Sequence, residues 1–246
     1  NSGITSIELP ATLETIGDCA FHSCRGLTSI TLPSSLTSIG EYAFVGCSGL
    51  TEVDLSKCTS LTSIENDTFW NCGGLTSITL PSSLTSIGTS AFYGCTGLTS
   101  ITLPLSLTSI GNSAFNGCSG LTEVDLSVCT NLSSIGRYAF FGCSVLTEVD
   151  LSKCTSLIST GDQVFSDSGL ESITLPSSLT KIGFSEFSGC TGLTTIRIEA
   201  TTPPTLPSDA IPSNVTTIEV PSASVDVYKS ARGWSSHASK IVGYKN

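Results

Sequence analysis

The amino-acid sequence predicts a solenoid, a rod in which coils of one repeated unit stack on each other. The phrase LTSITLPSSLTSIG begins at Leu27 and again at Leu75, and variants of it recur along most of the 246 residues. Within each phrase apolar residues alternate with Ser or Thr, which is the periodicity of a β-strand. The repeats start 22 to 25 residues apart, at Ile4, Leu27, Leu50, Leu75, Leu98, Leu121, Leu146, Leu170, Leu193 and Val215. Ten stacked coils are therefore expected over residues 4–220.

Each coil opens with the expected strand. In the second coil Leu27, Ile30 and Leu32 are predicted to point inward, while Ser29 and Thr31 point outward. In five coils a proline follows this strand and ends it, because proline has no N–H to donate to a neighbouring strand. At a strand spacing of about 4.8 Å, ten coils would make a rod roughly 45–50 Å long.

The second half of each coil carries a further apolar pair, a glycine and then a phenylalanine. One coil cannot bury these side chains alone, so we expect stacked coils to bury them against each other. The phenylalanines would then form one column through the rod, made of Phe21, Phe44, Phe69, Phe92, Phe115, Phe140, Phe165 and Phe187.

Each coil closes with G-C-x-G or a variant of it. The last glycine of this motif, as in Gly49, Gly97, Gly120 and Gly192, is expected to adopt a positive φ. Seven cysteines recur once per coil, and no C-x-x-C pair suggests a zinc site. A buried ladder of reduced thiols is favoured, since buried cysteine behaves as a small hydrophobe. Bridges between neighbouring coils are the alternative, because their Cα atoms would lie about 5 Å apart.

Residues 221–246 differ from the repeats and are predicted to form a capping segment next to the solenoid of residues 1–220. A short helix is expected after Ser222 or Ser224, with Gly233 as its stop. A solenoid needs such a cap to cover the apolar side of its last coil. The residues expected to cover it are Val225, Tyr228, Trp234, Ile241 and Val242. The other end begins close to a strand, and we expect more repeats or a leader to precede Asn1 in the full gene product.

The pattern L-x-x-I-x-L-P-x-x-L-x-x-I-G-x-x-A-F-x-x-C resembles the BspA-like (TpLRR-type) class of bacterial leucine-rich-repeat surface proteins. This resemblance implies an α/β fold, a right-handed, curved leucine-rich-repeat solenoid with a parallel sheet on its concave side and short helical or irregular turns opposite. It also implies export to the surface or surroundings of a bacterium, and adhesion or binding of a host or surface protein. The coil at Leu146 departs from the pattern, because Ser168 stands where the closing cysteine should be.

Composition and motifs exclude several other functions. The formal net charge of −10 argues against nucleic-acid binding, which needs clustered Lys and Arg. No run of eighteen apolar residues suggests a transmembrane helix. The two histidines, His22 and His237, lie almost a whole rod apart, and neither a G-x-S-x-G elbow nor a phosphate-binding loop is present. We therefore expect a monomeric protein that is not an enzyme and holds no cofactor.

Paired acids replace the outward Ser and Thr in three coils. Two of the pairs lie on adjacent coils, so their four carboxylates are expected within about 5–7 Å of each other. They are interpreted as a solubilising face, as a surface for a basic partner or as a calcium site. The six residues are Glu52, Asp54, Glu123, Asp125, Glu148 and Asp150.

A second candidate surface follows the phenylalanine column. The residue after each phenylalanine varies between coils, so it is expected to be exposed on the turn side. Val45, Trp70 and Tyr93 would then form an apolar strip on consecutive coils. Such a strip is interpreted either as a partner-binding surface or as local packing over the turn. Three hypotheses follow: a protein-binding or adhesion module, a structural spacer on the bacterial surface, and a calcium- or carbohydrate-binding module.

Overall fold

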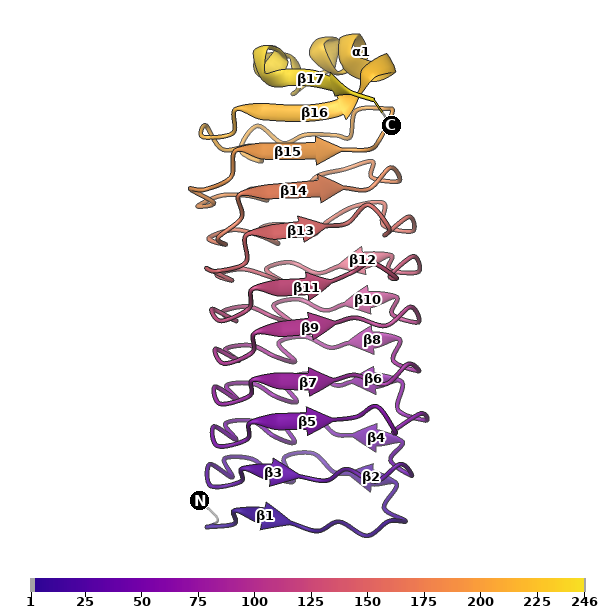
Figure 1. Ribbon diagram of the computed structural model, residues 1–246, viewed down its shortest axis with the longest axis vertical. Coiled ribbons are helices and arrows are strands. Elements are labelled where there is room, and N and C mark those ends of the chain that lie inside the picture. Colours follow the sequence, from indigo (N-terminus) through magenta and orange to yellow (C-terminus); the bar gives the residue numbers. More distant parts are fainter. Residues whose placement is uncertain (1–2, 246) are drawn as a thin grey trace.

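A computed structural model describes residues 3–245 as a stack of coils around one apolar core (Figure 1). The first strand of each coil pairs in parallel with its equivalent in at least one neighbouring coil; β1 and β3, for example, place Ser6 opposite Ser29 and Ile7 opposite Ile30. In each of these pairs, residues at the same position of the repeat lie opposite each other, as Glu52 does Ser77 and Glu123 does Ser100. The strands of this first column are β1 (Ser6–Ile7), β3 (Ser29–Ile30), β5 (Glu52–Asp54), β7 (Ser77–Thr79), β9 (Ser100–Thr102), β11 (Glu123–Asp125), β13 (Glu148–Asp150), β14 (Ser172–Leu175), β15 (Thr195–Ile198) and β16 (Thr217–Pro221).

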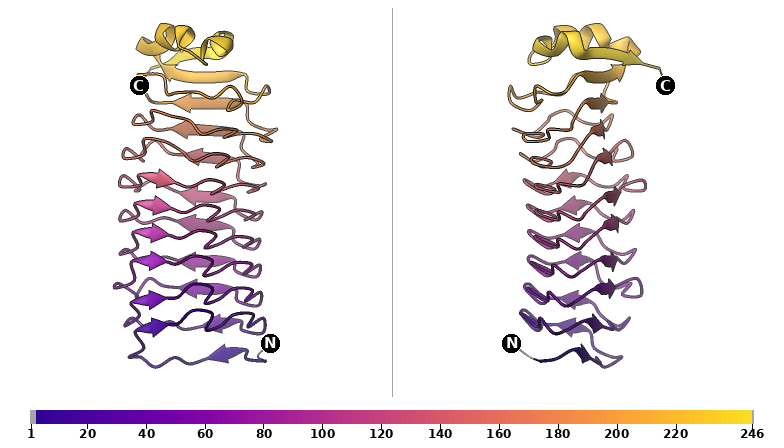
Figure 2. Two further views of the ribbon diagram at one scale, coloured as in Figure 1. Left: turned by 180° about the vertical axis from the view of Figure 1, so that it is seen from behind. Right: turned by 60° about the vertical axis from the view of Figure 1, so that its left-hand side comes forward.

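A second column of short parallel strands lies on the opposite side of the rod, where the resemblance implied helical or irregular turns (Figure 2). Each of these strands has the same Ser-Ile or Thr-Ile sequence, with the isoleucine buried in the core. Within residues 3–245 no helix lies on this side of the repeats, whereas the expected turns follow each of these strands, as at residues 41–46. The strands are β2 (Thr15–Ile16), β4 (Ser38–Ile39), β6 (Ser63–Ile64), β8 (Ser86–Ile87), β10 (Ser109–Ile110) and β12 (Ser134–Ile135).

The two strand columns explain the shape of the rod. A packed helix is about 10 Å wide and an extended strand needs about 4.8 Å, so helices on one side would force the stack to bend. Here both sides are extended and rise by the same amount per coil. The coils accordingly stack along a nearly straight axis instead of the expected curved one (Figure 1). The right-handed winding stays a prediction.

The predicted phenylalanine column runs through the core. Neighbouring rings are nearly parallel, with centroids 5.1 Å apart for Phe21 and Phe44 and 6.2 Å apart for Phe165 and Phe187. The cysteines of the closing motif are buried beside this column and none of the cysteines in residues 3–245 forms a disulfide. The reduced ladder is therefore what the structure contains.

The buried thiols are also hydrogen-bond donors, a role that the sequence analysis did not foresee. The Cys95 thiol donates to the carbonyl oxygen of Phe69 in the previous coil, at 3.2 Å between Sγ and O. The Cys118 thiol likewise donates to Phe92, at 3.1 Å. Burial raises the pKa of Cys118 to about 12, which keeps the thiol protonated. The ladder therefore joins successive coils by hydrogen bonds as well as by packing.

Hydroxyl side chains add further bonds between coils. Thr76 Oγ1 donates to the carbonyl oxygen of Thr51 at 2.9 Å, and Thr51 Oγ1 donates in turn to that of Thr28 at 3.4 Å. On another edge, Ser83 Oγ donates to the carbonyl oxygen of Leu61 at 2.6 Å. Much of the Ser and Thr content of this chain thus serves the stacking of the coils.

The closing glycines differ from the expectation. Positive φ occurs at the first glycine of G-C-x-G, with values of 66° at Gly46 and 68° at Gly94. The last glycine, which was expected to adopt it, is needed for another reason. At Gly49 an added Cβ would clash with the carbonyl oxygen of Arg25, because the backbone of the previous coil passes so close.

The C-terminal segment consists of η1 (Ser222–Ser224), α1 (Val225–Ser230), η2 (Ser235–Lys240) and β17 (Ile241–Tyr244), and it packs beside β16 (Figure 1). Tyr228 and Trp234 are fully buried, and the Tyr228 hydroxyl donates to the carbonyl oxygen of Ala200 at 2.8 Å. Two details of the prediction are wrong: α1 ends before Gly233, and Val242 is 46% exposed because it faces away from β16's buried side. That residues 221–246 form a separate capping unit stays a prediction.

Helices are confined to this segment within residues 3–245, and none of them is long and apolar enough to cross a membrane.

Candidate functional site

The three acidic pairs lie in the first strand column, on β5, β11 and β13. Glu52, Glu123 and Glu148 are exposed and flank a buried valine in each strand. Across residues 3–245 the single ion pair joins Arg197 and Glu219, so none of these three glutamates is neutralised by a neighbouring cation. Each therefore presents a full carboxylate to solvent.

The aspartates of the same pairs have a structural task. The carboxylates of Asp54, Asp125 and Asp150 each accept a hydrogen bond from the backbone N–H two residues ahead, at 2.8, 2.9 and 2.8 Å. Such Asx turns replace the proline that ends the strand in other coils. Hydrogen bonds from Ser56 and Ser127 lower the pKa of Asp54 and Asp125, respectively.

This local bonding bears on the calcium hypothesis. The strands β11 and β13 belong to different sheets, and their aspartates turn back onto their own loops. No group of three or more His, Cys, Asp or Glu side chains that could hold a metal ion occurs within the described part of the chain. The four carboxylates therefore do not assemble into the calcium cluster that the sequence suggested.

The turn-side strip is only partly exposed. Val45 is buried, with 5% of its surface accessible, so the expectation that it is exposed is wrong. Trp70 is 37% exposed and Tyr93 is half-buried, and their ring centroids lie 6.0 Å apart at a tilt of 33°. Val45 is short and is flanked by the larger His22 and Trp70 on the coils before and after it, which explains its burial.

This size difference leaves a cavity of about 320 Å³ on the turn side. Three consecutive coils build it, and Val45 and Gly46 of the middle coil lie between the longer side chains of the outer two. The lining residues are His22, Ser23, Arg25, Val45, Gly46, Ser48, Trp70 and Asn71. The sequence analysis placed Val45 and Trp70 on neighbouring coils but did not predict the cavity. Its signal in the sequence is a small pair, Val45-Gly46, at the position where the coils before and after have the larger pairs His22-Ser23 and Trp70-Asn71.

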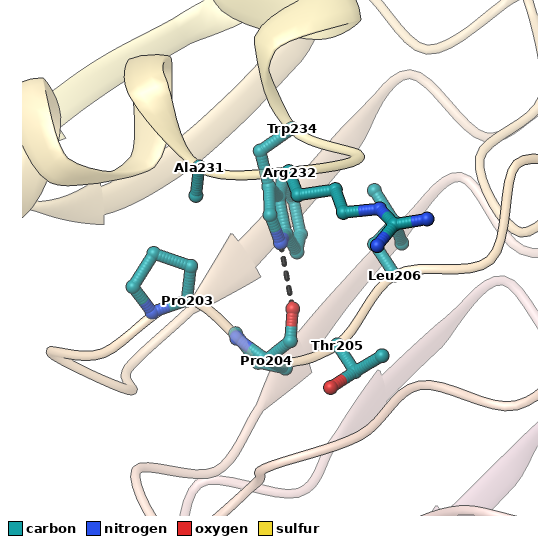
Figure 3. A pocket seen from close by; sticks show the side chains of 7 residues that line it. All are labelled: Pro203, Pro204, Thr205, Leu206, Ala231, Arg232 and Trp234. Carbon is teal, nitrogen blue, oxygen red and sulfur yellow. Dashed lines mark hydrogen bonds between the residues drawn. The ribbon is translucent and has the colours of Figure 1, made fainter.

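A larger cavity, of about 450 Å³, lies where the C-terminal segment meets the proline-rich loop at residues 203–206. Figure 3 shows Trp234 pointing from this segment toward Pro204, with the Arg232 side chain beside it. The Trp234 indole N–H donates to the carbonyl oxygen of Pro204 at 2.7 Å. The indole is thus used to hold the loop against the segment.

One buried acid was also missed. Glu186 occupies the position before the column phenylalanine, where most coils have alanine, and it is only 1% exposed. Neither carboxyl oxygen has a hydrogen-bond partner among the described residues. Burial raises the pKa of Glu186 well above its usual range, and the Asp162 carboxylate acts in the same direction. The Thr160 hydroxyl and the Gly183 N–H lie close to the carboxyl group and act in the opposite direction. Burial therefore favours the protonated, neutral form of this carboxyl group.

Comparisons with known proteins agree with the repeat architecture. The sequence model of the BspA type leucine rich repeat region matches in six copies, over residues 1–122, 62–194 and 119–231. A search of curated proteins finds no match.

Several solved structures are similar to this chain. A leucine-rich repeat protein from Bacteroides ovatus is 31% identical over 87% of this chain, with a TM-score of 0.60; the match spans 63% of that protein's length. The leucine rich repeat protein of T. pallidum is 26% identical, covering 78% of this chain and 79% of its own, with a TM-score of 0.47. A leucine rich cell surface protein from Faecalibacterium prausnitzii is 25% identical, covering 98% and 78%, with a TM-score of 0.44.

Proposed function

Because the chain belongs to the family of BspA-type leucine-rich repeats, whose repeat matches extend over residues 1–231, we propose that it is a non-enzymatic protein-binding module. Its place of action is the bacterial surface or the surrounding medium, where it mediates adhesion or another contact with a host or surface protein. The surface description of the Faecalibacterium prausnitzii protein is in keeping with this location.

The proposed contact surface is the outer face of the first strand column. No helix or loop covers this face along β3 to β13 (Figure 1), so the outward side chains of successive coils lie side by side. Most are Ser and Thr, and the exposed Glu52, Glu123 and Glu148 add unpaired charge. This uncovered face with free carboxylates is the observation that carries the proposal.

The charges indicate a basic partner. Like the rest of a chain with net charge −10, the face repels acidic surfaces and attracts Lys- and Arg-rich ones. Exposed carboxylates act mainly on the rate and specificity of association, so binding should weaken as salt is added. The apolar residues Trp70 and Tyr93 lie on the turn side and are not part of this surface.

Site-specific photo-crosslinking tests the proposal within a single coil. A photoreactive amino acid replaces Glu123 on β11, and a matched variant carries it at the exposed Ser134 on β12, on the opposite side of the same coil. Incubated with intact target cells or matrix proteins, the first variant should give discrete adducts and the second should not. Replacing Glu52 and Glu148 by Gln should reduce those adducts at low salt.

Two results would redirect the proposal. Adducts from neither position would favour the structural spacer, which has no preferred face. Adducts from Ser134 alone would move the binding surface to the second strand column. Location is tested separately, by treating intact source cells with protease and following loss of the protein by immunoblot; full protection would argue against surface exposure.

A further inference from the structure

The cavity between the first three coils has walls of different chemistry. Trp70 forms an aromatic wall, and Val45 with Gly46 contributes the apolar part between the outer coils. Phe21 and Phe44 in the core lie 5.1 Å apart, and Phe44 and Phe69 lie 5.2 Å apart, so the cavity spans two coil steps. Its volume of about 320 Å³ is in the range of small-ligand sites.

Polar groups surround the apolar part. Ser23, Ser48, Asn71 and His22 provide hydroxyl, amide and imidazole groups, and Ser23 Oγ lies 3.0 Å from Nδ1 of His22. The Asn71 side chain lies in the space above Gly94, where an added Cβ would collide with its amide oxygen. The Asn71 amide oxygen therefore lies against the backbone of the fourth coil.

Arg25 gives the cavity its charge. No acidic residue lines the cavity, and across residues 3–245 Arg25 takes part in no ion pair. The chain has twice as many acidic as basic residues, so most of its surface repels anions. The unpaired guanidinium of Arg25 makes this cavity a place where an anion is attracted. It also offers paired N–H donors that match both oxygens of a carboxylate.

We propose that this cavity binds a pyranose sugar that carries a carboxylate, such as a sialic or uronic acid residue of a glycan. The aromatic wall of Trp70 packs against the C–H face of the ring, the surrounding hydroxyl and amide groups bond the sugar hydroxyls, and Arg25 binds the carboxylate. This site lies on the turn side, apart from the protein-binding face proposed above, and does not depend on it.

Fluorescence offers a direct test, because the chain has two tryptophans in different surroundings. Trp70 is 37% exposed and Trp234 is fully buried, so acrylamide quenches Trp70 selectively. The 246-residue chain is titrated with N-acetylneuraminic acid and with glucuronic acid, and glucose and acetate serve as controls. We expect one or both sugar acids to protect Trp70 from quenching at millimolar concentration, glucose at least tenfold more weakly, and acetate not at all.

Variants assign the binding to this cavity. Arg25→Gln should weaken binding of the sugar acids at least tenfold and leave the weak binding of glucose unchanged. Arg137→Gln, which removes another exposed arginine five coils away from Arg25, is the matched control and should change neither. Val45→Phe should fill the cavity and abolish binding. Calorimetric titration measures the binding, and a melting curve shows that the variant is folded.

The outcomes separate the alternatives. A response to one acid alone still supports the proposal and identifies the kind of glycan. Equal binding of glucose and the sugar acids, no effect of Arg25→Gln, or no protection of Trp70 by either acid would each overturn it. Binding that persists in a folded Val45→Phe protein would place the ligand elsewhere and overturn it as well.

Discussion

The coils from Leu27 to Val145 and those from Leu146 to Gly192 follow the same backbone path but differ in their buried side chains. In the first group each coil places an isoleucine before the bend and a cysteine at its close. In the second group Thr160 replaces the isoleucine, Ser168 replaces the cysteine, and Glu186 stands in a column of mostly alanine. The coils still stack in register, since Thr160 pairs with Ile135 of the previous coil, just as Ile135 pairs with Ile110.

This difference shows what the fold requires of each buried position. Isoleucine to threonine removes apolar volume, and alanine to glutamate on the next coil adds volume beside it, so the packing is conserved across the pair of coils. The Thr160 hydroxyl also accepts a hydrogen bond from the N–H of Gly183 at 3.2 Å. Volume is compensated there, but the polarity of Glu186 is compensated only in part: burial outweighs the effect of the Thr160 hydroxyl and the Gly183 N–H on its pKa.

The largest effect is expected from breaking the phenylalanine column in the regular coils. Phe115 is stacked on both sides, with centroids 5.2 Å from Phe92 and from Phe140. Phe115→Ala should lower the free energy of unfolding by about 3–5 kcal/mol, as for other buried phenylalanines. Phe187 is 6.2 Å from its neighbour Phe165, and Phe187→Ala should cost less. Urea denaturation measures both; equal losses would show that ring stacking adds nothing to burial.

The second effect concerns pH and the irregular coils. Between the ordinary glutamate pKa of 4.5 and the raised pKa of Glu186, the folded protein keeps a proton that the unfolded chain releases. Raising the pH through this window therefore favours unfolding, by up to about 1.4 kcal/mol per pH unit. The variant Glu186→Gln has no carboxyl group at this position, so the contribution of Glu186 to the pH dependence of stability should be lost. This holds whether the variant is more or less stable than the wild type at any single pH. Melting curves from pH 5 to 9 decide it, and parallel pH profiles of the two proteins would contradict it.

A smaller effect is expected from the thiol ladder. Cys95→Ala removes the hydrogen bond to the Phe69 carbonyl and should cost about 1 kcal/mol, whereas Cys95→Ser keeps a donor and should cost less. The irregular coil offers the reverse experiment, because Ser168 already lies 3.3 Å from the Cys190 thiol. Ser168→Cys should be neutral or stabilising in thermal melts under reducing conditions. A clear loss of stability would mean that the second group of coils has adapted its packing to serine.

The smallest effect is expected at the Asx turns. Asp125→Ala should lower the free energy of unfolding by about 0.5–1 kcal/mol, because it removes the acceptor of the Ser127 N–H. Asp125→Asn keeps an oxygen acceptor and should stay close to the wild type. Since the hydrogen bond lowers the pKa of Asp125, its stabilisation is present above the ordinary aspartate value of 3.8 and is lost as the pH falls below it. Equal stability of both variants at pH 7 would contradict this role.

The repeat period, the phenylalanine column and the reduced cysteines were predictable because stacking forces equivalent residues into equivalent surroundings. The second strand column was also written in the sequence: Leu36 to Ile39 reads LTSI, as Leu27 to Ile30 does. The glycine that follows, Gly40, indicates a bend, and the strand signal before it is only two residues long. A two-residue strand needs no long alternating pattern when a neighbouring coil supplies its hydrogen bonds.

The candidate sites were harder to predict because they depend on unequal neighbours. Variability at Val45 suggested exposure, but the accessible surface of a residue in a column is set by the side chains above and below it. The aspartates Asp54 and Asp125 share strands with free glutamates and look equivalent to them in the sequence. Only the geometry of the following loop shows that one acid of each pair is bonded to its own backbone.

The thiol column makes the order of events during maturation important. A thiolate attacks an oxidant or a disulfide, and a thiol does not. In the finished rod burial raises the pKa of Cys118 to about 12 and that of Cys95 well above 9.0, so these sulfurs are chemically silent. In a chain that has not yet stacked, the same cysteines are ordinary nucleophiles and neighbouring ones can cross-link out of register. Stacking thus changes the reactivity of these thiols, which is lower in the finished rod than in the unfolded chain.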